Sequence, residues 1–218
     1  MLGHFEIGGM FMKKFVIAIS REYGSGGRAI GKALAEELGI NCYDKAIIKL
    51  TSEKSGLEPS YIEKSEEKVT NSFLFSMQYS AYSSLDSLLL YDTPTNDKMF
   101  IAQSTVISDL AAKDSCIILG RCADYVLRDN ENLVRVFIRA NFEDRVKRAV
   151  ESYNLAQKNA ETAVKKADKA RANYYKYYTT RSWGAPENAD LMINSSFSGI
   201  DGAVDIIKSL LAAKGYID

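Results

Sequence analysis

Histidine is almost absent from this chain of 218 residues, which contains only His4, and cysteine is scarce. A Ser-His-Asp triad, a Cys-His pair and a histidine-rich metal site each need a histidine inside the folded domain. His4 precedes the first buried strand, so these three kinds of site are excluded. The three cysteines are Cys42, Cys116 and Cys122, and no two of them have CxxC spacing. We therefore predict neither a disulfide framework nor a zinc site, and we expect a reducing, cytoplasmic location.

An excess of charge of one sign is also missing, because 28 basic and 28 acidic side chains give a net charge of zero and a pI near 6.6. Proteins that coat nucleic acid or anionic membranes carry a marked positive charge, so neither partner is expected. No apolar run approaches the roughly 18 residues of a membrane span, and no signal-peptide pattern is present. The length fits one domain, which we assign to residues 13–218 after a lead at 1–12 that we expect to be disordered.

Apolar runs of strand length recur along the chain without alternating polar residues, most clearly at 15–20, 115–119 and 133–140. Such runs are typical of strands buried on both faces, as in a parallel sheet. The helical pattern after the first run starts near Ile30 and ends at Gly39. Strands that alternate with helices predict an α/β fold with a mostly parallel sheet. Shorter strands are expected at 40–43 and 190–195, and further helices at 44–55, 142–153 and 200–213.

A glycine loop, residues 21–29 with the sequence REYGSGGRA, joins the first buried strand to the first helix. Glycine tolerates positive φ angles, so successive N–H groups can converge on an anion, and the helix N-terminus adds about half a positive charge. The alternative is a tight strand-to-helix turn in which glycine serves only the geometry, and this alternative stays open. The strand before the loop and the helix after it favour a phosphate site.

The glycine loop departs from the pattern GxxxxGK[ST] of phosphate-binding loops. Arg21 replaces the first glycine, Gly27 replaces the lysine, and neither Arg28 nor Ala29 provides the hydroxyl that binds magnesium. A backbone cradle survives these changes, since any residue but proline supplies an N–H group. The charge of the lysine is lost, and we predict that Arg28 restores it by folding back across the phosphates.

Four blocks of the sequence resemble the cytidylate-kinase-like family of P-loop nucleoside monophosphate kinases. The resemblance runs from about residue 15 to 211 and is weakest at 56–112. Ile118-Leu119-Gly120-Arg121 resembles the block whose arginine holds the acceptor phosphate, although Cys122 stands where cytidylate kinases have aspartate. The other blocks are residues 19–38, 42–44, and 137–148 with 168–181.

The resemblance implies a three-layer P-loop kinase fold with a mostly parallel five-stranded sheet flanked by helices. It also implies a helical acceptor-binding insertion at about residues 56–112 and a basic lid at about 155–183. Within residues 71–114 we expect mostly helix, with Pro94 as the clearest break. The aromatic and leucine-rich stretch at 73–91 is core, a wall of the acceptor site or a dimer contact, so the chain is expected to be a monomer or a homodimer.

The lid segment departs from the neutral average, with six basic and two acidic residues between 159 and 181. A solvated charged face is the usual explanation of such a run. On a helix, however, Arg171, Tyr174, Tyr175 and Tyr178 share one face. An exposed helix gains nothing from so many aromatic rings, so the tyrosines can instead pack a hinge or a subunit contact, or stack on a base.

Phosphoryl transfer needs positioned positive charge rather than covalent chemistry, so it can proceed without histidine. We expect Arg28, Arg145 and Arg171 to be catalytic, with Arg145 and Arg171 on the γ-phosphate of the donor. The residues expected to bind the donor β-phosphate are Tyr23, Gly24, Ser25, Gly26, Gly27, Arg28 and Ala29.

On the acceptor side, we expect Arg121 and Arg181 to hold the phosphate and Asp44 to orient the nucleoside or a magnesium-bound water. The cofactors are then ATP and Mg²⁺, with no direct metal ligand from the protein. The expected function is phosphoryl transfer from ATP to a small acceptor, best a nucleoside monophosphate such as CMP. Two alternatives stay open: a regulatory protein that binds nucleotide or phosphate without turnover, and a kinase of a small molecule that is not a nucleotide.

Overall fold

The computed structural model describes residues 4–7, 10–56, 58 and 93–218, and its centre is a five-stranded sheet. The strands of this sheet are β3 (Val16–Arg21), β4 (Asn41–Tyr43), β5 (Cys116–Leu119), β6 (Leu133–Arg139) and β7 (Leu191–Asn194). Their spatial order is β4-β5-β3-β6-β7, and every neighbouring pair is parallel. The predicted α/β fold with a parallel sheet is confirmed.

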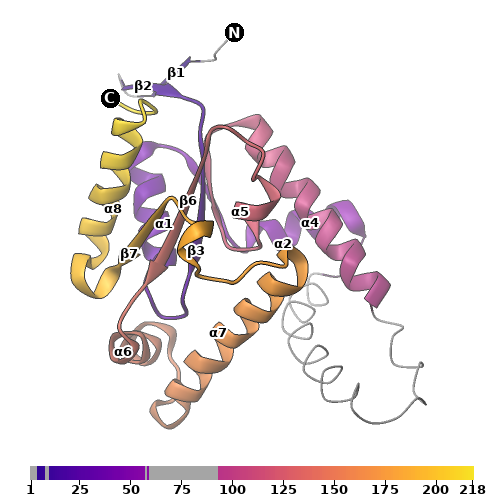
Figure 1. Ribbon diagram of the computed structural model, residues 1–218, viewed down its shortest axis with the longest axis vertical. Coiled ribbons are helices and arrows are strands. Elements are labelled where there is room, and N and C mark those ends of the chain that lie inside the picture. Colours follow the sequence, from indigo (N-terminus) through magenta and orange to yellow (C-terminus); the bar gives the residue numbers. More distant parts are fainter. Residues whose placement is uncertain (1–3, 8–9, 57, 59–92) are drawn as a thin grey trace.

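Helices cover both faces of this sheet and give three layers (Figure 1). They are α1 (Gly27–Leu38), α2 (Ala46–Ser55), α4 (Thr93–Lys113), α5 (Ala123–Val126), α6 (Phe142–Tyr153), α7 (Gln157–Thr179) and α8 (Ser195–Ala213), with a 3₁₀ turn at Pro186–Asn188. Ile17 and Ile19 of β3 pack with α1 and α8, whereas Val16 and Ala18 pack with α2, α4 and α5. Because alternate residues of a strand point to opposite faces, β3 is the centre of both cores.

The unit of strand, glycine loop and helix forms where the sequence predicts it. α1 ends at Gly39, which has φ 63° and whose N–H caps the carbonyl groups of Ala35 and Glu36. A left-handed residue at this position is the common way to end a helix, and glycine adopts it without steric cost. The last helix, α8, has a break at Gly199 (φ 72°), so its regular part begins at Ile200, as expected.

The N-terminal lead differs from the expectation of disorder. β1 (His4–Ile7) and β2 (Met10–Lys13) pair as an antiparallel hairpin, with His4 opposite Lys13. Two short apolar segments separated by two glycines are a hairpin signal, which the sequence carries at Gly8-Gly9. The start of the main domain at residue 13 stays a prediction.

The expected insertion is described only in part. α4 covers its last third and begins at Thr93, so Pro94 lies in the first turn of a helix, where proline is tolerated. Residues 59–92, which include the aromatic stretch at 73–91, lie outside the described residues. Among the helices that are described, none is long and apolar enough to cross a membrane.

Three of the four tyrosines of α7 pack inward, while Tyr177 is exposed. Tyr174 and Tyr175 are buried, and the ring of Tyr178 stacks on Phe100 of α4 with centroids 4.0 Å apart. The Tyr175 hydroxyl donates to Asp124 Oδ2 at 2.6 Å, and burial raises the pKa of that carboxyl. These contacts attach α7 to α4 and α5, so one face of the basic segment belongs to the core.

The cysteines give a test of this layering. Cys116 at the start of β5 is 1% exposed, and burial raises the pKa of its thiol to about 12. Because the thiolate is the reacting form, we expect Cys116 and the buried Cys122 to resist a thiol reagent at pH 8 until the protein unfolds. The partly exposed Cys42 reacts first, and Cys42→Ser removes this phase. Equal rates for all three thiols in the folded protein would contradict the layering.

Candidate active site

The glycine loop leaves the end of β3 and enters α1 through two left-handed residues, Gly24 (φ 79°) and Gly26 (φ 81°). Left-handed residues within such a turn direct neighbouring N–H groups to one side, which is the geometry of an anion-binding nest. In the described part of the chain, the N–H groups of Gly24, Gly26 and Gly27 have no hydrogen-bond acceptor. The loop therefore presents amides at the N-terminus of α1, where the helix dipole also favours an anion.

Other N–H groups of the loop are used inside the protein, and Glu22 N–H donates to the Ile138 carbonyl at 3.0 Å. Tyr23 N–H donates to Asp168 Oδ1 at 2.7 Å, and Ser25 N–H donates to the Glu22 carbonyl at 3.3 Å. The buried Ser25 hydroxyl donates to the same carbonyl at 2.9 Å, and Ser195 Oγ donates to the Ser25 carbonyl at 2.5 Å. Of the residues predicted to bind phosphate, Tyr23 and Ser25 therefore shape the loop, while the glycine amides are left for an anion.

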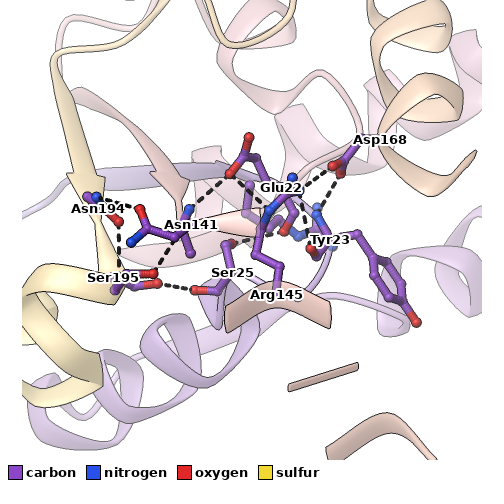
Figure 2. Close-up of polar contacts among 12 residues, drawn as sticks. Glu22, Tyr23, Ser25, Asn141, Arg145, Asp168, Asn194 and Ser195 are labelled. Atoms are coloured by element: carbon purple, nitrogen blue, oxygen red, sulfur yellow. Dashed lines mark hydrogen bonds and ion pairs between the residues drawn. The ribbon is translucent and has the colours of Figure 1, made fainter. Parts of the chain in front are cut away.

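Arg145 braces the loop from α6, as Figure 2 shows. Its guanidinium pairs with Asp168 of α7, its Nη1 donates to the Tyr23 carbonyl at 3.4 Å, and its Nε lies 3.5 Å from Glu22 Oε2. The same Glu22 oxygen accepts from Ala140 N–H at 2.9 Å. Arg145 is only 8% exposed, so its charge needs these carboxylates close by. The network ties the loop to β6, α6 and α7 independently of any ligand.

The backbone of α6 approaches the loop more closely than a side chain would allow. A Cβ at Gly24 would collide with the backbone oxygen of Arg145, and the positive φ also favours glycine. Arg148, one turn further along α6, donates from Nη1 to the Gly24 carbonyl at 2.5 Å. Gly24 is therefore required both by its conformation and by its contact with α6.

A cleft of about 500 Å³ opens beside the loop at the carboxyl ends of β3, β4 and β5. Open parallel sheets bind ligands at this edge. Four cations and one carboxylate are the charged lining residues, namely Arg21, Lys45, Arg121, Arg171 and Asp44. Aromatic rings also line the cleft, from Tyr23, Tyr174, Tyr175 and Trp183. The excess of positive charge favours an anionic ligand, and the rings suit a flat apolar group.

The arginines of the cleft are held in place by protein contacts. Asp44, which follows β4, has Oδ2 2.8 Å from Arg28 Nε and Oδ1 3.6 Å from Arg21 Nη2. Arg171 donates to the Arg21 carbonyl at 3.0 Å and lies 5.4 Å from the centre of the Tyr23 ring. Burial lowers the pKa of Arg171, because desolvation disfavours the charged form. An anion in the cleft would offset this desolvation.

Arg121 enters the cleft from a turn with an unusual backbone. Gly120, Arg121 and Cys122 have φ angles of 72°, 58° and 54°. For residues other than glycine, the left-handed region costs about 1–2 kcal/mol each and persists only where the surroundings impose it, often at functional sites. The turn lies at the end of β5. Arg121, the predicted acceptor arginine, is one of the residues that line the cleft.

Three predicted arginines are not brought to the lining of the cleft. Arg145 is buried in its ion pairs, and Arg181 lies 5.3 Å over the ring of Tyr125. Arg28 stands outside the lining, with its side chain 48% exposed and its Nε on Asp44. To touch a phosphate in the cleft, Arg145 would have to leave two carboxylates and Arg181 would have to leave Tyr125.

Several residues of the site have no place in the sequence-based prediction. Arg21 enters it only as a replacement of the first glycine, and Lys45 belongs to no motif. Glu22 and Asp168 are the partners of Arg145. The sequence carried one signal for this pair, which is the acidic residue Glu22 inside a loop predicted to bind an anion. A carboxylate at such a place needs a cation beside it.

Residues 16–197 match the model of the cytidylate kinase-like family. The chain belongs to the cytidylate kinase-like family. The match includes the glycine loop, the turn at Arg121 and the whole of α6 and α7. Among curated proteins the comparison finds no match.

Solved structures share the fold of this chain. An uncharacterized protein from Eubacterium ventriosum is 28% identical with a TM-score of 0.67, over 92% of this chain and 99% of that one. Shikimate kinases from Acinetobacter baumannii, in complex with shikimate, and from Bacteroides thetaiotaomicron have TM-scores of 0.50 at 16% and 15% identity. They cover 92% and 93% of this chain, and 95% and 99% of their own. At this identity the shikimate kinases show the fold alone, which is the α/β P-loop fold.

The brace at Arg145 predicts a stability effect. Arg145→Gln leaves Glu22 and Asp168 without their cation, so we expect the free energy of unfolding in urea to fall by about 3 kcal/mol. The matched control is Arg128→Gln, because Arg128 and its partner Asp129 are exposed and such pairs contribute roughly 1 kcal/mol or less. Equal losses in the two variants would show that Arg145 does not brace the loop.

Proposed function

We propose that the protein transfers a phosphoryl group from ATP to a small anionic acceptor, best a nucleoside monophosphate such as CMP. The observation that carries this proposal is the cleft, where four cations face one carboxylate next to a loop of unused glycine amides. Membership of the cytidylate kinase-like family supports the phosphotransferase class, and the choice of CMP is ours.

The donor phosphates are assigned to the amides of the glycine loop. The N–H groups of Gly24, Gly26 and Gly27 have room for acceptor oxygens, and those of Arg28 and Ala29 add the first turn of α1. Arg171 is assigned to the γ-phosphate. Positive charge placed on the oxygens of the phosphoryl group is the main contribution that a protein makes to this reaction.

The acceptor phosphate is assigned to Arg121, with Arg181 joining it only if its guanidinium leaves Tyr125. Tyr174 and Trp183 give the cleft apolar walls that fit a nucleobase. Asp44 is the carboxylate of this lining, so it is the group we assign to the acceptor hydroxyls or to a water on Mg²⁺. Mg²⁺ would be bound by phosphate oxygens and water, and would neutralise charge on the phosphates. The roles of residues 56–112 as acceptor-side insertion and 155–183 as lid belong to the same proposal.

One observation favours a second candidate, a regulatory protein that binds nucleotide or phosphate without turnover. The glycine loop has neither the lysine nor the magnesium-binding hydroxyl of the usual pattern, at Gly27 and Arg28. The divergent residue Cys122 keeps a third candidate open, a kinase whose acceptor is not a nucleotide.

Incubation with ATP, Mg²⁺ and a panel of nucleoside monophosphates separates these candidates. The expected result is that ADP is released only when an acceptor is added, and fastest with CMP. Tight ATP binding without ADP release from any acceptor would favour the regulatory candidate. ADP release only with a hydroxylated acid or another non-nucleotide would favour the third.

Removing a cleft arginine tests the proposed roles. We expect Arg121→Ala and Arg171→Ala each to lower turnover at least about tenfold, since one charge-stabilising arginine can contribute 10³ or more in rate. Arg121→Ala raises the KM for the acceptor, whereas Arg171→Ala mainly lowers kcat.

The control for both variants is Arg128→Ala, which removes an arginine that pairs with Asp129 away from the cleft and leaves turnover unchanged. Undiminished turnover in both cleft variants would refute the assigned roles.

A further inference from the structure

Arg21 stands at the position of the first glycine in the usual phosphate-binding pattern, and its side chain runs into the cleft. It is the last residue of β3, at the carboxyl end of the central strand. The side chain is 19% exposed, so most of it is covered by protein. A cation at this depth is costly unless it meets negative charge, and the Asp44 carboxylate in the cleft is one such charge.

The stem of Arg21 fills the space that a lysine at position 27 would need. A Cβ built on Gly27 would lie 2.7 Å from Arg21 Cβ and 3.0 Å from its Cγ, closer than side chains can pack. The next neighbour is Ile138 Cβ at 3.4 Å, which is an ordinary contact. Arg21 and a side chain at position 27 therefore exclude each other, and the two departures from the usual loop are one coupled change.

The guanidinium of Arg21 lies against a second glycine. A Cβ on Gly120, at the end of β5, would collide with Arg21 Nη1, and Gly120 has φ 72°. The guanidinium thus passes over Gly120 and reaches Asp44, with Nη2 3.6 Å from Oδ1. Arg171 holds the start of this path by donating to the Arg21 carbonyl at 3.0 Å.

We propose that Arg21 is the catalytic cation of the loop, in place of the lysine missing at Gly27. The positive charge has moved from the start of α1 to the end of β3, and its guanidinium contacts the phosphates of the donor in exchange for Asp44. This inference rests on the proposed function, because it names a further residue that neutralises the donor phosphates.

Arg28, the residue that the sequence suggests for this task, is less suited to it. Its side chain is 48% exposed, and its Nε already lies 2.8 Å from Asp44 Oδ2. Arg21 lines the cleft and Arg28 does not. Charge acts more strongly on an anion where water is excluded, so the buried guanidinium has the larger effect.

The test removes the cation at position 21 and then restores a cation at position 27. Arg21→Gln is expected to lower kcat/KM for ATP at least about 100-fold, and Arg28→Gln to lower it less. Arg21→Gly combined with Gly27→Lys recreates the glycine and lysine of the usual pattern, and we expect it to regain at least about tenfold over Arg21→Gly alone. Gly27→Lys alone meets the stem of Arg21, so it should lower the thermal midpoint, and the double variant should recover it.

A binding measurement separates this inference from the proposed function. Inorganic tripolyphosphate is titrated into each variant by calorimetry, and Arg21→Gln should bind it at least about tenfold more weakly than the native protein. Native protein without acceptor-dependent ADP release would refute the proposed function while leaving this readout intact. Arg128→Gln is the matched control with unchanged binding, and the thermal midpoint of Arg21→Gln checks that it is folded.

Four results would overturn the inference. They are native protein that does not bind tripolyphosphate, undiminished binding and turnover in Arg21→Gln, a larger loss in Arg28→Gln than in Arg21→Gln, and no gain in the double variant over Arg21→Gly.

Discussion

The ion pairs of Arg145 with Glu22 and Asp168 are the interaction on which the rest of the site depends. They join the loop after β3 to α6 and α7, two helices that come more than a hundred residues later in the chain. Because Asp168 also accepts the Tyr23 N–H, one carboxylate fixes both the guanidinium and the backbone of the loop. The glycine amides beside the cleft are thereby held in place without help from a ligand, which is the preorganisation that electrostatic catalysis requires.

Arginine side chains both support the loop and line the cleft in this site. In the usual phosphate-binding loop, a lysine and a hydroxyl group contact the phosphates and the magnesium ion. Arg145 supports the loop, while Arg21, Arg121 and Arg171 line the cleft. A guanidinium keeps its charge when buried and presents a planar fork to phosphate oxygens, so it serves both purposes. Arg21 and Arg145 each have a carboxylate within reach, at Asp44 and Asp168.

Most of the fold follows from local patterns in the sequence. The buried run at 15–20 gives β3, and Gly39 ends α1 by a cap that only needs its own helix. The hairpin at β1 and β2 was missed although Gly8-Gly9 carries the signal, because a short apolar lead rich in glycine also fits disorder. Local rules succeed where the partners are a few residues apart.

The site is less predictable because its partners are distant in sequence. The role predicted for Arg145 depends on which carboxylates it meets, and Glu22 lies on another element. The departure at Gly27 is plain in the sequence, but its connection with Arg21 and Gly120 depends on three chain segments that meet only in the folded sheet. The sequence motif therefore locates this site, while tertiary contacts determine which arginine braces the loop and which arginines line the cleft.

The central claim is that the glycine loop binds donor phosphate with Arg21 in place of lysine. A crystal structure with ADP and Mg²⁺ tests it most directly. The account predicts the β-phosphate on the N–H groups of Gly24, Gly26 and Gly27, with the Arg21 guanidinium at hydrogen-bond distance, about 2.7–3.2 Å. A β-phosphate bound away from these amides, or bound there with Arg21 still on Asp44 and Arg28 on the phosphate, would contradict it.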